Sequence, residues 1–184
     1  MADEPIRSLR PNVTREQALC AFRGPGLPSL YWRVRRGALA RIADAYVPFR
    51  FYRVRYHSGG RAHAHLFALD AVDGSLDLFE FAAPPEESET VSLTTRNRPP
   101  SALPEPLAEQ LVKEKVLRMI FQQGFFKLRG MKLEAERLPG EIHLPYWLGF
   151  YGSPDRLRCR VLDAVRRRIE GARASALFEQ WLAA

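Results

Sequence analysis

Two distant stretches of this sequence repeat one pattern. Each starts with an apolar residue, Pro and an aromatic residue, and each ends with Leu-Asp-Ala-Val; the first runs from Val47 to Val72 and the second from Leu144 to Val165. The spacing from Pro to Asp differs by four residues between Pro48–Asp70 and Pro145–Asp163. That difference falls in the central turn, where changes of length cost least. The repeat therefore predicts a chain built from two similar units.

A helix is predicted before each repeated block. In the first half, Thr14 and Gln17 have the spacing of a capping box, and Gly24-Pro25 ends the helix. In the second half, Pro104-Glu105-Pro106 opens a longer helix that closes at Gly124. The apolar stripe of this second helix consists of Val112, Val116, Met119 and Ile120. An aromatic, basic strand is expected after each helix, at Leu30–Arg35 and at Phe125–Arg129.

These elements predict an α+β fold of two similar halves, each a helix packed on an antiparallel sheet, with one continuous sheet as an option. The expected boundaries are a first repeat at 1–82, a Pro-rich connector at 83–106 and a second repeat at 107–184. Six of the fourteen prolines lie in the connector, which is read as an extended link with a short edge strand at Val91–Thr94. A final helix is expected over Ala172–Trp181, with an apolar side formed by Leu177, Phe178, Trp181 and Leu182.

Aligning Asp70 with Asp163 predicts which side of each repeated strand faces the core. One side is apolar in both copies and is assigned to the core: Ala64, Leu66 and Ala68 in the first, and Leu157, Cys159 and Val161 in the second. The other side is assigned to a wetter surface: His63, His65 and Phe67 in the first, and Arg156, Arg158 and Arg160 in the second.

The chain is basic, with 28 Lys and Arg against 21 Asp and Glu, a net charge of +7. Such a balance favours acidic partners, yet the excess is spread along the sequence, with net +4 in residues 1–82 and net +4 in 105–184. The densest candidate binding set consists of Arg156, Arg158, Arg160, Arg166, Arg167 and Arg168, with Tyr146 and Trp147 nearby. Its arginines could contact phosphates while the aromatic rings stack on bases. The alternative is a solvated sheet face with the rings in a small core.

Three clustered histidines are the candidate metal ligands: His57, His63 and His65. His63 and His65 share a strand face. A two-residue turn at Gly59-Gly60 would put His57 on the opposite face, whereas a three-residue turn would bring all three together. Gly-Gly favours the shorter turn, and nearby arginines would repel a cation. Solvated histidines are therefore favoured over a zinc or iron site, and no cofactor is expected.

Other catalytic chemistry has weak support. Asp70 and Asp163 end equivalent strands, where a carboxylate usually accepts hydrogen bonds from the amides of the following turn, so a structural role is favoured over acid–base catalysis. Cys20 and Cys159 lie far apart, with no C-x-x-C, and each is expected to act as a small apolar core residue. Glycine-rich phosphate loops, G-x-S-x-G and H-E-x-x-H are absent from the sequence.

One segment bears a distant resemblance to a known type of module. The strand ending Leu69-Asp70-Ala71-Val72-Asp73-Gly74, preceded by the helix-forming segment Val13–Leu19, resembles PepSY-type modules and repeat-built bacterial proteins with Pro-aromatic strands. The resemblance covers mainly residues 13–81 and implies a regulatory or inhibitory role, although such modules are mostly extracytoplasmic. The second copy departs from the pattern at Arg166, and the resemblance carries over no functional residue.

We therefore expect a non-enzymatic interaction or regulatory module that docks another macromolecule, most simply a protein. Two alternatives stay open: nucleic-acid binding through a basic, aromatic sheet face, and an enzyme or small-molecule binder with a pocket between the halves. The N-terminal residues lack the apolar run of a secretory signal, and no stretch reaches membrane-spanning length, so a cytoplasmic location is expected. The oligomeric state does not follow from the sequence.

Overall fold

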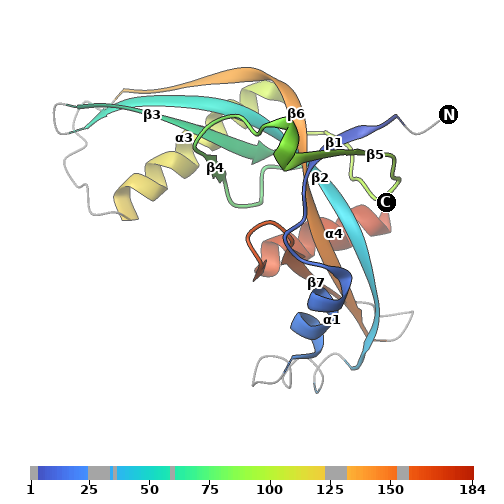
Figure 1. The fold of residues 1–184 in the computed structure, drawn as a ribbon. Helices are drawn as coiled ribbons and strands as arrows, with labels where there is room; N and C mark the ends of the chain where they lie inside the picture. Colours follow the sequence, from blue (N-terminus) through green and yellow to red (C-terminus); the bar gives the residue numbers. More distant parts are fainter. Residues whose placement is uncertain (1–3, 25–33, 35–36, 59–60, 123–131, 153–157) are drawn as a thin grey trace. The chain divides into compact units, whose positions relative to one another are not determined.

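A computed structural model describes residues 4–24, 34, 37–58, 61–122, 132–152 and 158–184 (Figure 1). The fold is α+β, as predicted. The helices are α1 (Arg15–Arg23), α3 (Glu105–Gln122), α4 (Ala172–Ala183) and a short 3-10 turn, η1 (Glu87–Glu89). The strands are β1 (Ile6–Leu9), β2 (Leu39–Ser58), β3 (Arg61–Asp70), β4 (Phe79–Phe81), β5 (Thr90–Leu93), β6 (Leu133–Tyr151), β7 (Arg158–Asp163) and β8 (Arg168–Ile169).

The eight strands form one mixed sheet. Its main path runs β4-β3-β2-β6-β1-β5, and β7 pairs with both β6 and β8. β1 runs parallel to β6, where Ser8 lies opposite His143, and the other described ladders are antiparallel. β5 is the edge strand that was predicted in the connector. Among the described residues, no helix is long and apolar enough to cross a membrane.

The chain forms two compact units, and each unit combines distant segments of the sequence. Unit 1 comprises residues 1–47, 88–99 and 143–184, and unit 2 comprises residues 48–87 and 100–142. The long strands β2 and β6 each contribute residues to both units. The expectation of two similar halves, divided around residues 82 and 107, stays a prediction.

In unit 1, α1 packs on the hairpin formed by β6 and β7. The capping box is confirmed, because Thr14 Oγ1 accepts from the Gln17 amide at 3.3 Å and the Thr14 amide donates to Gln17 Oε1 at 2.9 Å. Phe22 is 2 % exposed and its ring lies over Gly149, where an added Cβ would come within 2.9 Å of it. The Tyr151 hydroxyl donates to the Phe22 carbonyl at 2.9 Å. These contacts hold α1 on the hairpin.

The helix α4 packs on β7 in the same unit. Leu177 and Phe178 are buried, as predicted, and the Phe178 ring lies 5.7 Å from that of Tyr146. Leu182 was assigned to the same apolar side, but its side chain is half exposed, so that assignment is wrong. Leu182 lies in the last turn of the helix.

In unit 2, α3 packs on the hairpin formed by β2 and β3 (Figure 1). The predicted stripe is confirmed, because Val112, Val116 and Ile120 are buried and Met119 packs partly buried against them. The hairpin contributes four buried side chains to this core: Tyr52, Val54, Phe67 and Leu69. Burial of these apolar groups is the main force holding the helix on the sheet.

The two hairpins share a local hydrogen-bonding pattern. The Ala71 amide donates to the Pro48 carbonyl at 2.8 Å, and the Ala164 amide donates to the Pro145 carbonyl at 3.1 Å. The repeated sequence thus forms matching bonds at the base of each hairpin. The helix that precedes the first block, α1, packs on the second hairpin, and α3, which precedes the second block, packs on the first. Each of these helices therefore packs on the hairpin that does not directly follow it in the sequence.

The predicted faces of β3 are reversed at its outer end. Tyr56 lies opposite His63 and Val54 lies opposite His65, so both histidines are on the side that faces α3. Ala64, which was assigned to the core, is exposed. The residues of β3 alternate between two sides as predicted. The side that α3 covers is set by the larger side chains of β2 and not by the alanines of β3.

Candidate functional site

Only some members of the predicted arginine set are exposed at the surface. Arg158 is exposed, and its Nη1 lies 3.1 Å from Glu179 Oε2. Arg160 is 8 % exposed. Arg167 is exposed, whereas Arg166 is half-buried. Arg156 lies outside the described residues. The set therefore does not form the continuous basic face that the sequence suggested.

The two predicted aromatic residues belong to the core of unit 1. Tyr146 is 3 % exposed. The Trp147 indole is half-buried and its Nε1 donates to the Val13 carbonyl at 2.9 Å. The Tyr146 ring is covered and the Trp147 ring is partly covered, and the predicted base-stacking role of this pair stays a prediction.

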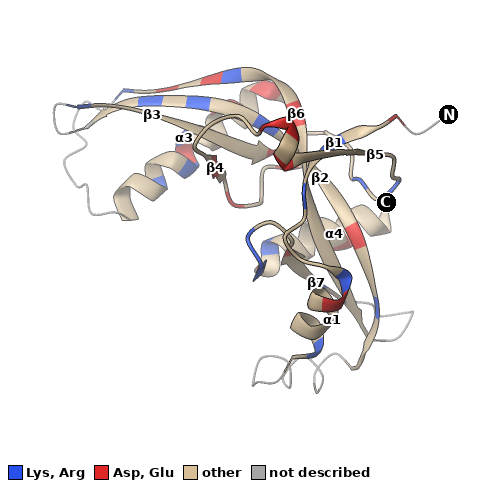
Figure 2. Ribbon diagram, in the orientation of Figure 1, with Lys and Arg blue, Asp and Glu red and all other residues tan. Residues whose placement is uncertain are grey.

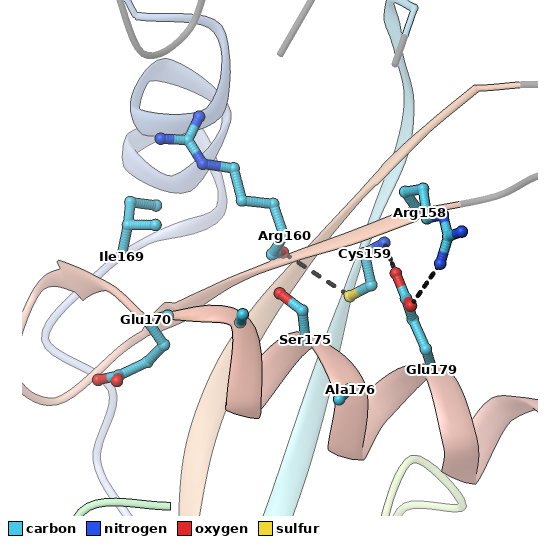
Figure 3. A pocket seen from close by; sticks show the side chains of 10 residues that line it. Arg158, Cys159, Arg160, Ile169, Glu170, Ser175, Ala176 and Glu179 are labelled. Atoms are coloured by element: carbon cyan, nitrogen blue, oxygen red, sulfur yellow. Dashed lines mark hydrogen bonds and ion pairs between the residues drawn. The ribbon is translucent and has the colours of Figure 1, made fainter. Parts of the chain in front are cut away.

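Both sides of β7 are covered, which corrects the expectation of one wet side. Arg160 lies opposite Gly149, on the side that packs against α1, whereas Cys159 faces α4. Figure 3 shows the Arg160 side chain extending away from α4, while Glu179 reaches up from α4 toward Arg158. A helix on each side of one strand is a tertiary arrangement that the strand's own alternation cannot reveal.

A pocket of about 420 Å³ lies between α4 and strands β7 and β8 (Figure 3). Glu179 occupies one side of it and accepts from Arg158 and, at 2.9 Å, from the Cys159 amide. Ser175 and Ala176 line it from α4. Of its charged side chains, Arg158 and Glu179 are thus engaged with each other, and Glu170 pairs with Arg168. The predicted alternative of a small-molecule pocket between the halves stays a prediction.

The three candidate metal ligands do not share a face. His57 lies opposite Ala62, which is the register of the shorter turn, and so it points to the side of the sheet away from His63 and His65. The His65 Nδ1 lies 2.7 Å from Glu80 Oε1, and the ring of His63 stacks on Tyr56 at 5.0 Å. In the described part of the chain, no group of three or more His, Cys, Asp or Glu could hold a metal ion.

The two repeated aspartates cap the turns that follow their strands. Asp70 Oδ1 accepts from the amides of Asp73 and Gly74 at 3.1 and 2.8 Å, and its Oδ2 accepts from Leu76 at 2.9 Å. Asp163 Oδ1 accepts from two amides of its own turn, both at 2.8 Å. Both carboxylates are buried. The structural role that was favoured for them is confirmed by these bonds.

The two cysteines have opposite surroundings. Cys159 is 1 % exposed, and burial, with a smaller contribution from Glu179, raises the pKa of its thiol to about 12. Cys20 is exposed on α1, so its assignment as a core residue is wrong. Its helix turns Ala18 and Phe22 inward, which leaves position 20 on the outer side.

We expect iodoacetamide to alkylate Cys20 in the folded protein and to leave Cys159 unmodified, because the buried thiol is both inaccessible and protonated. Peptide mass spectrometry before and after unfolding in urea measures this, and both residues should react in urea. A Cys20→Ser variant serves as the control and should take up no label while folded. Modification of Cys159 at native conditions would contradict the burial described here.

An ion cluster in unit 2 was missed by the sequence reading. Arg50 Nε lies 2.9 Å from Glu141 Oε1, and its Nη1 donates to the Leu103 carbonyl at 2.6 Å. Glu105 approaches Arg50 at 3.5 Å and accepts from the Tyr52 hydroxyl at 2.9 Å. Burial, and next this hydrogen bond, raise the pKa of Tyr52. The available signal was a single arginine within the apolar and aromatic run Val47–Tyr52. The cluster ties the start of α3 to the hairpin.

The charge of the molecule is divided between the units. Unit 1 holds 17 basic and 9 acidic side chains, a net charge of +8, whereas unit 2 holds 11 and 12, a net charge of −1. All 17 basic residues of unit 1 are arginine. In Figure 2 the turn that leads from β7 toward α4 is blue. The even spread along the sequence therefore becomes a strong asymmetry once the chain is folded.

Comparisons with protein-family models, with curated proteins and with solved structures found no match to this chain. The resemblance to PepSY-type modules stays a prediction.

Proposed function

We propose that this protein is a non-enzymatic module that docks an acidic macromolecule, and that unit 1 makes the contact. The observation that carries the proposal is the division of charge, with net +8 on unit 1 and net −1 on unit 2. A concentrated positive field attracts polyanions and raises their rate of association. Unit 2 would contribute little to such attraction.

The arginines of unit 1 are accessible to a partner. Ten of the thirteen that are described are exposed. Guanidinium groups donate in a rigid fork that matches carboxylates and phosphates, and they hold their charge at every physiological pH. A surface rich in arginine is therefore suited to binding anionic oxygens.

The groups that could support catalysis have structural partners instead. Asp70 and Asp163 accept amides of their own turns, and the Cys159 thiol is buried. This supports the non-enzymatic part of the proposal. Both cysteines are free thiols, which fits the expected cytoplasmic location.

We expect the full chain to bind both a labelled mixed-sequence DNA duplex and labelled polyglutamate of similar length at low salt, because both present regular anionic oxygens. Fluorescence anisotropy measures the dissociation constant, which should rise steeply with salt as screening weakens the attraction. Labelled polylysine is the control and should not bind. Absence of binding to both anionic probes at low salt would contradict the proposal.

A further inference from the structure

We infer that the turn between β7 and β8 is a phosphate-contact site for nucleic acid, a role that rests on the proposed function and names its partner. The turn and the first residue of β8 carry three consecutive arginines, Arg166–Arg168. Its backbone is held firmly, because the Arg167 amide donates to the Asp163 carbonyl at 3.0 Å and Asp163 Oδ1 accepts from the Arg166 amide at 2.8 Å. A firmly held turn presents its charges in a defined place.

Two further arginines lie at the starts of the helices whose leading segments adjoin this turn. The Asn12 amide donates to the Ala164 carbonyl at 2.7 Å, and Asn12 Nδ2 donates to the Val165 carbonyl at 2.9 Å. Arg15 follows three residues later, at the start of α1. Arg173 lies in the first turn of α4, shortly after β8. The cluster thus gathers cations from both ends of the sequence.

Three of these guanidinium groups are available for an external anion. Arg15, Arg167 and Arg173 are exposed, and none of the three forms an ion pair with any residue that the structure describes. Arg15 interacts electrostatically with Glu16, its neighbour in the sequence, but Glu16 is fully exposed, so solvent screens the pair. The other two arginines of the turn have acidic neighbours, Asp163 at 3.9 Å from Arg166 and Glu170 at 2.8 Å from Arg168. We define the available set, Arg15, Arg167 and Arg173, as the arginine triad.

The backbone of Arg167 provides an independent observation. Its φ is +59°, in the left-handed region, and it is the only described residue other than glycine with a positive φ. Glycine or asparagine would adopt this conformation more easily. The Arg167 side chain is exposed and forms no hydrogen bond or ion pair with a described residue. Backbone strain at such a residue indicates a role in binding another molecule.

The same observations favour a nucleic-acid backbone over an acidic protein. The triad consists of guanidinium groups, which bind phosphate with two parallel hydrogen bonds. Tyr146 and Trp147 are the aromatic residues that the sequence predicts beside these arginines. Tyr146 is buried, and the Trp147 indole donates to the Val13 carbonyl. Contacts would therefore be made to phosphates without base stacking, and phosphate contacts carry little sequence information. Binding should be strong at low salt and nearly independent of sequence.

The test compares two triple variants of the full chain. One removes the triad (Arg15→Gln, Arg167→Gln, Arg173→Gln). The matched control removes three exposed cations of unit 2 (Arg61→Gln, Arg118→Gln, Lys132→Gln). Anisotropy with a labelled DNA duplex of about two helical turns, at several salt concentrations, measures the affinity and its salt dependence.

We expect the triad variant to weaken duplex binding at least about tenfold at low salt and to reduce the slope of log K against log salt by roughly 2 to 3, since each lost phosphate contact removes about 0.9. The control variant should change the affinity by less than about twofold, because its three cations lie on the unit that carries no excess positive charge. Equal losses in the two variants would overturn the site. A wild-type chain that binds polyglutamate but not the duplex would overturn the nucleic-acid inference and leave the proposed function standing, whereas binding of neither would overturn both.

A single substitution separates binding from folding. Arg167→Gly relieves the left-handed strain, so we expect its melting temperature to be unchanged or raised by about 2 °C while duplex binding weakens. A melting temperature that falls together with the affinity would show that Arg167 is retained for stability, and would overturn its role in binding.

Discussion

Replacing Phe22 with alanine is expected to lower the free energy of unfolding by about 4 kcal/mol, the largest effect that the structure predicts for a single side chain. The ring is 2 % exposed and lies on Gly149, in the cluster that joins α1 to the hairpin of β6 and β7. Its removal leaves a cavity that glycine cannot fill. Urea unfolding followed by circular dichroism measures the loss.

Phe121→Ala is the matched control for this substitution. Phe121 is also a helical phenylalanine, but its side chain is 47 % exposed near the end of α3. We expect a change of about 0.5 kcal/mol or less, because a surface side chain loses little burial. Similar losses in the two variants would show that Phe22 does not anchor α1 as described.

Asp70→Ala is expected to lower the free energy of unfolding by about 3 kcal/mol. The carboxylate is fully buried and accepts from three backbone amides, at Asp73, Gly74 and Leu76. Alanine leaves these donors without an acceptor, and two of the three bonds are buried, so water can replace them only in part. Urea unfolding at neutral pH measures the effect.

Asp73→Ala provides the comparison within the same turn. Asp73 Oδ1 accepts a single amide, that of Ser75, at 2.8 Å, and this bond is exposed. Its loss should cost about 0.5 kcal/mol, since solvent replaces the acceptor. If removal of Asp73 proved as costly as removal of Asp70, the number of buried amides would not be the source of stability.

The helices were predictable because their signals are local. The capping box at Thr14 and the stripe of Val112, Val116 and Ile120 act through neighbours within a few residues, and both appear as expected. The aspartate turns were predictable for the same reason, since Asp70 and Asp163 bind amides that follow them directly. Local hydrogen bonds need no knowledge of the rest of the chain.

The faces of the strands were not predictable in the same way. Alternation along β3 separates two sides, but only the position of α3 shows that the side of His65 and Phe67 is the covered one. On β7, helices on both sides bury Arg160 as well as Cys159. Which side of each strand is buried depends on which helix packs against it. That helix is distant in sequence, and its position is set by side-chain packing among several elements.

By itself, the sequence determined the fold class, the helices with their caps, the turn aspartates and the total charge, because these follow from composition and from contacts between near neighbours. Only the tertiary structure decided which helix covers which hairpin, and with it the division of a positive charge that is evenly spread along the chain into a basic unit and a nearly neutral one. The physical reason is that burial is shared among segments far apart in sequence, so the placement of every exposed arginine depends on the whole folded chain.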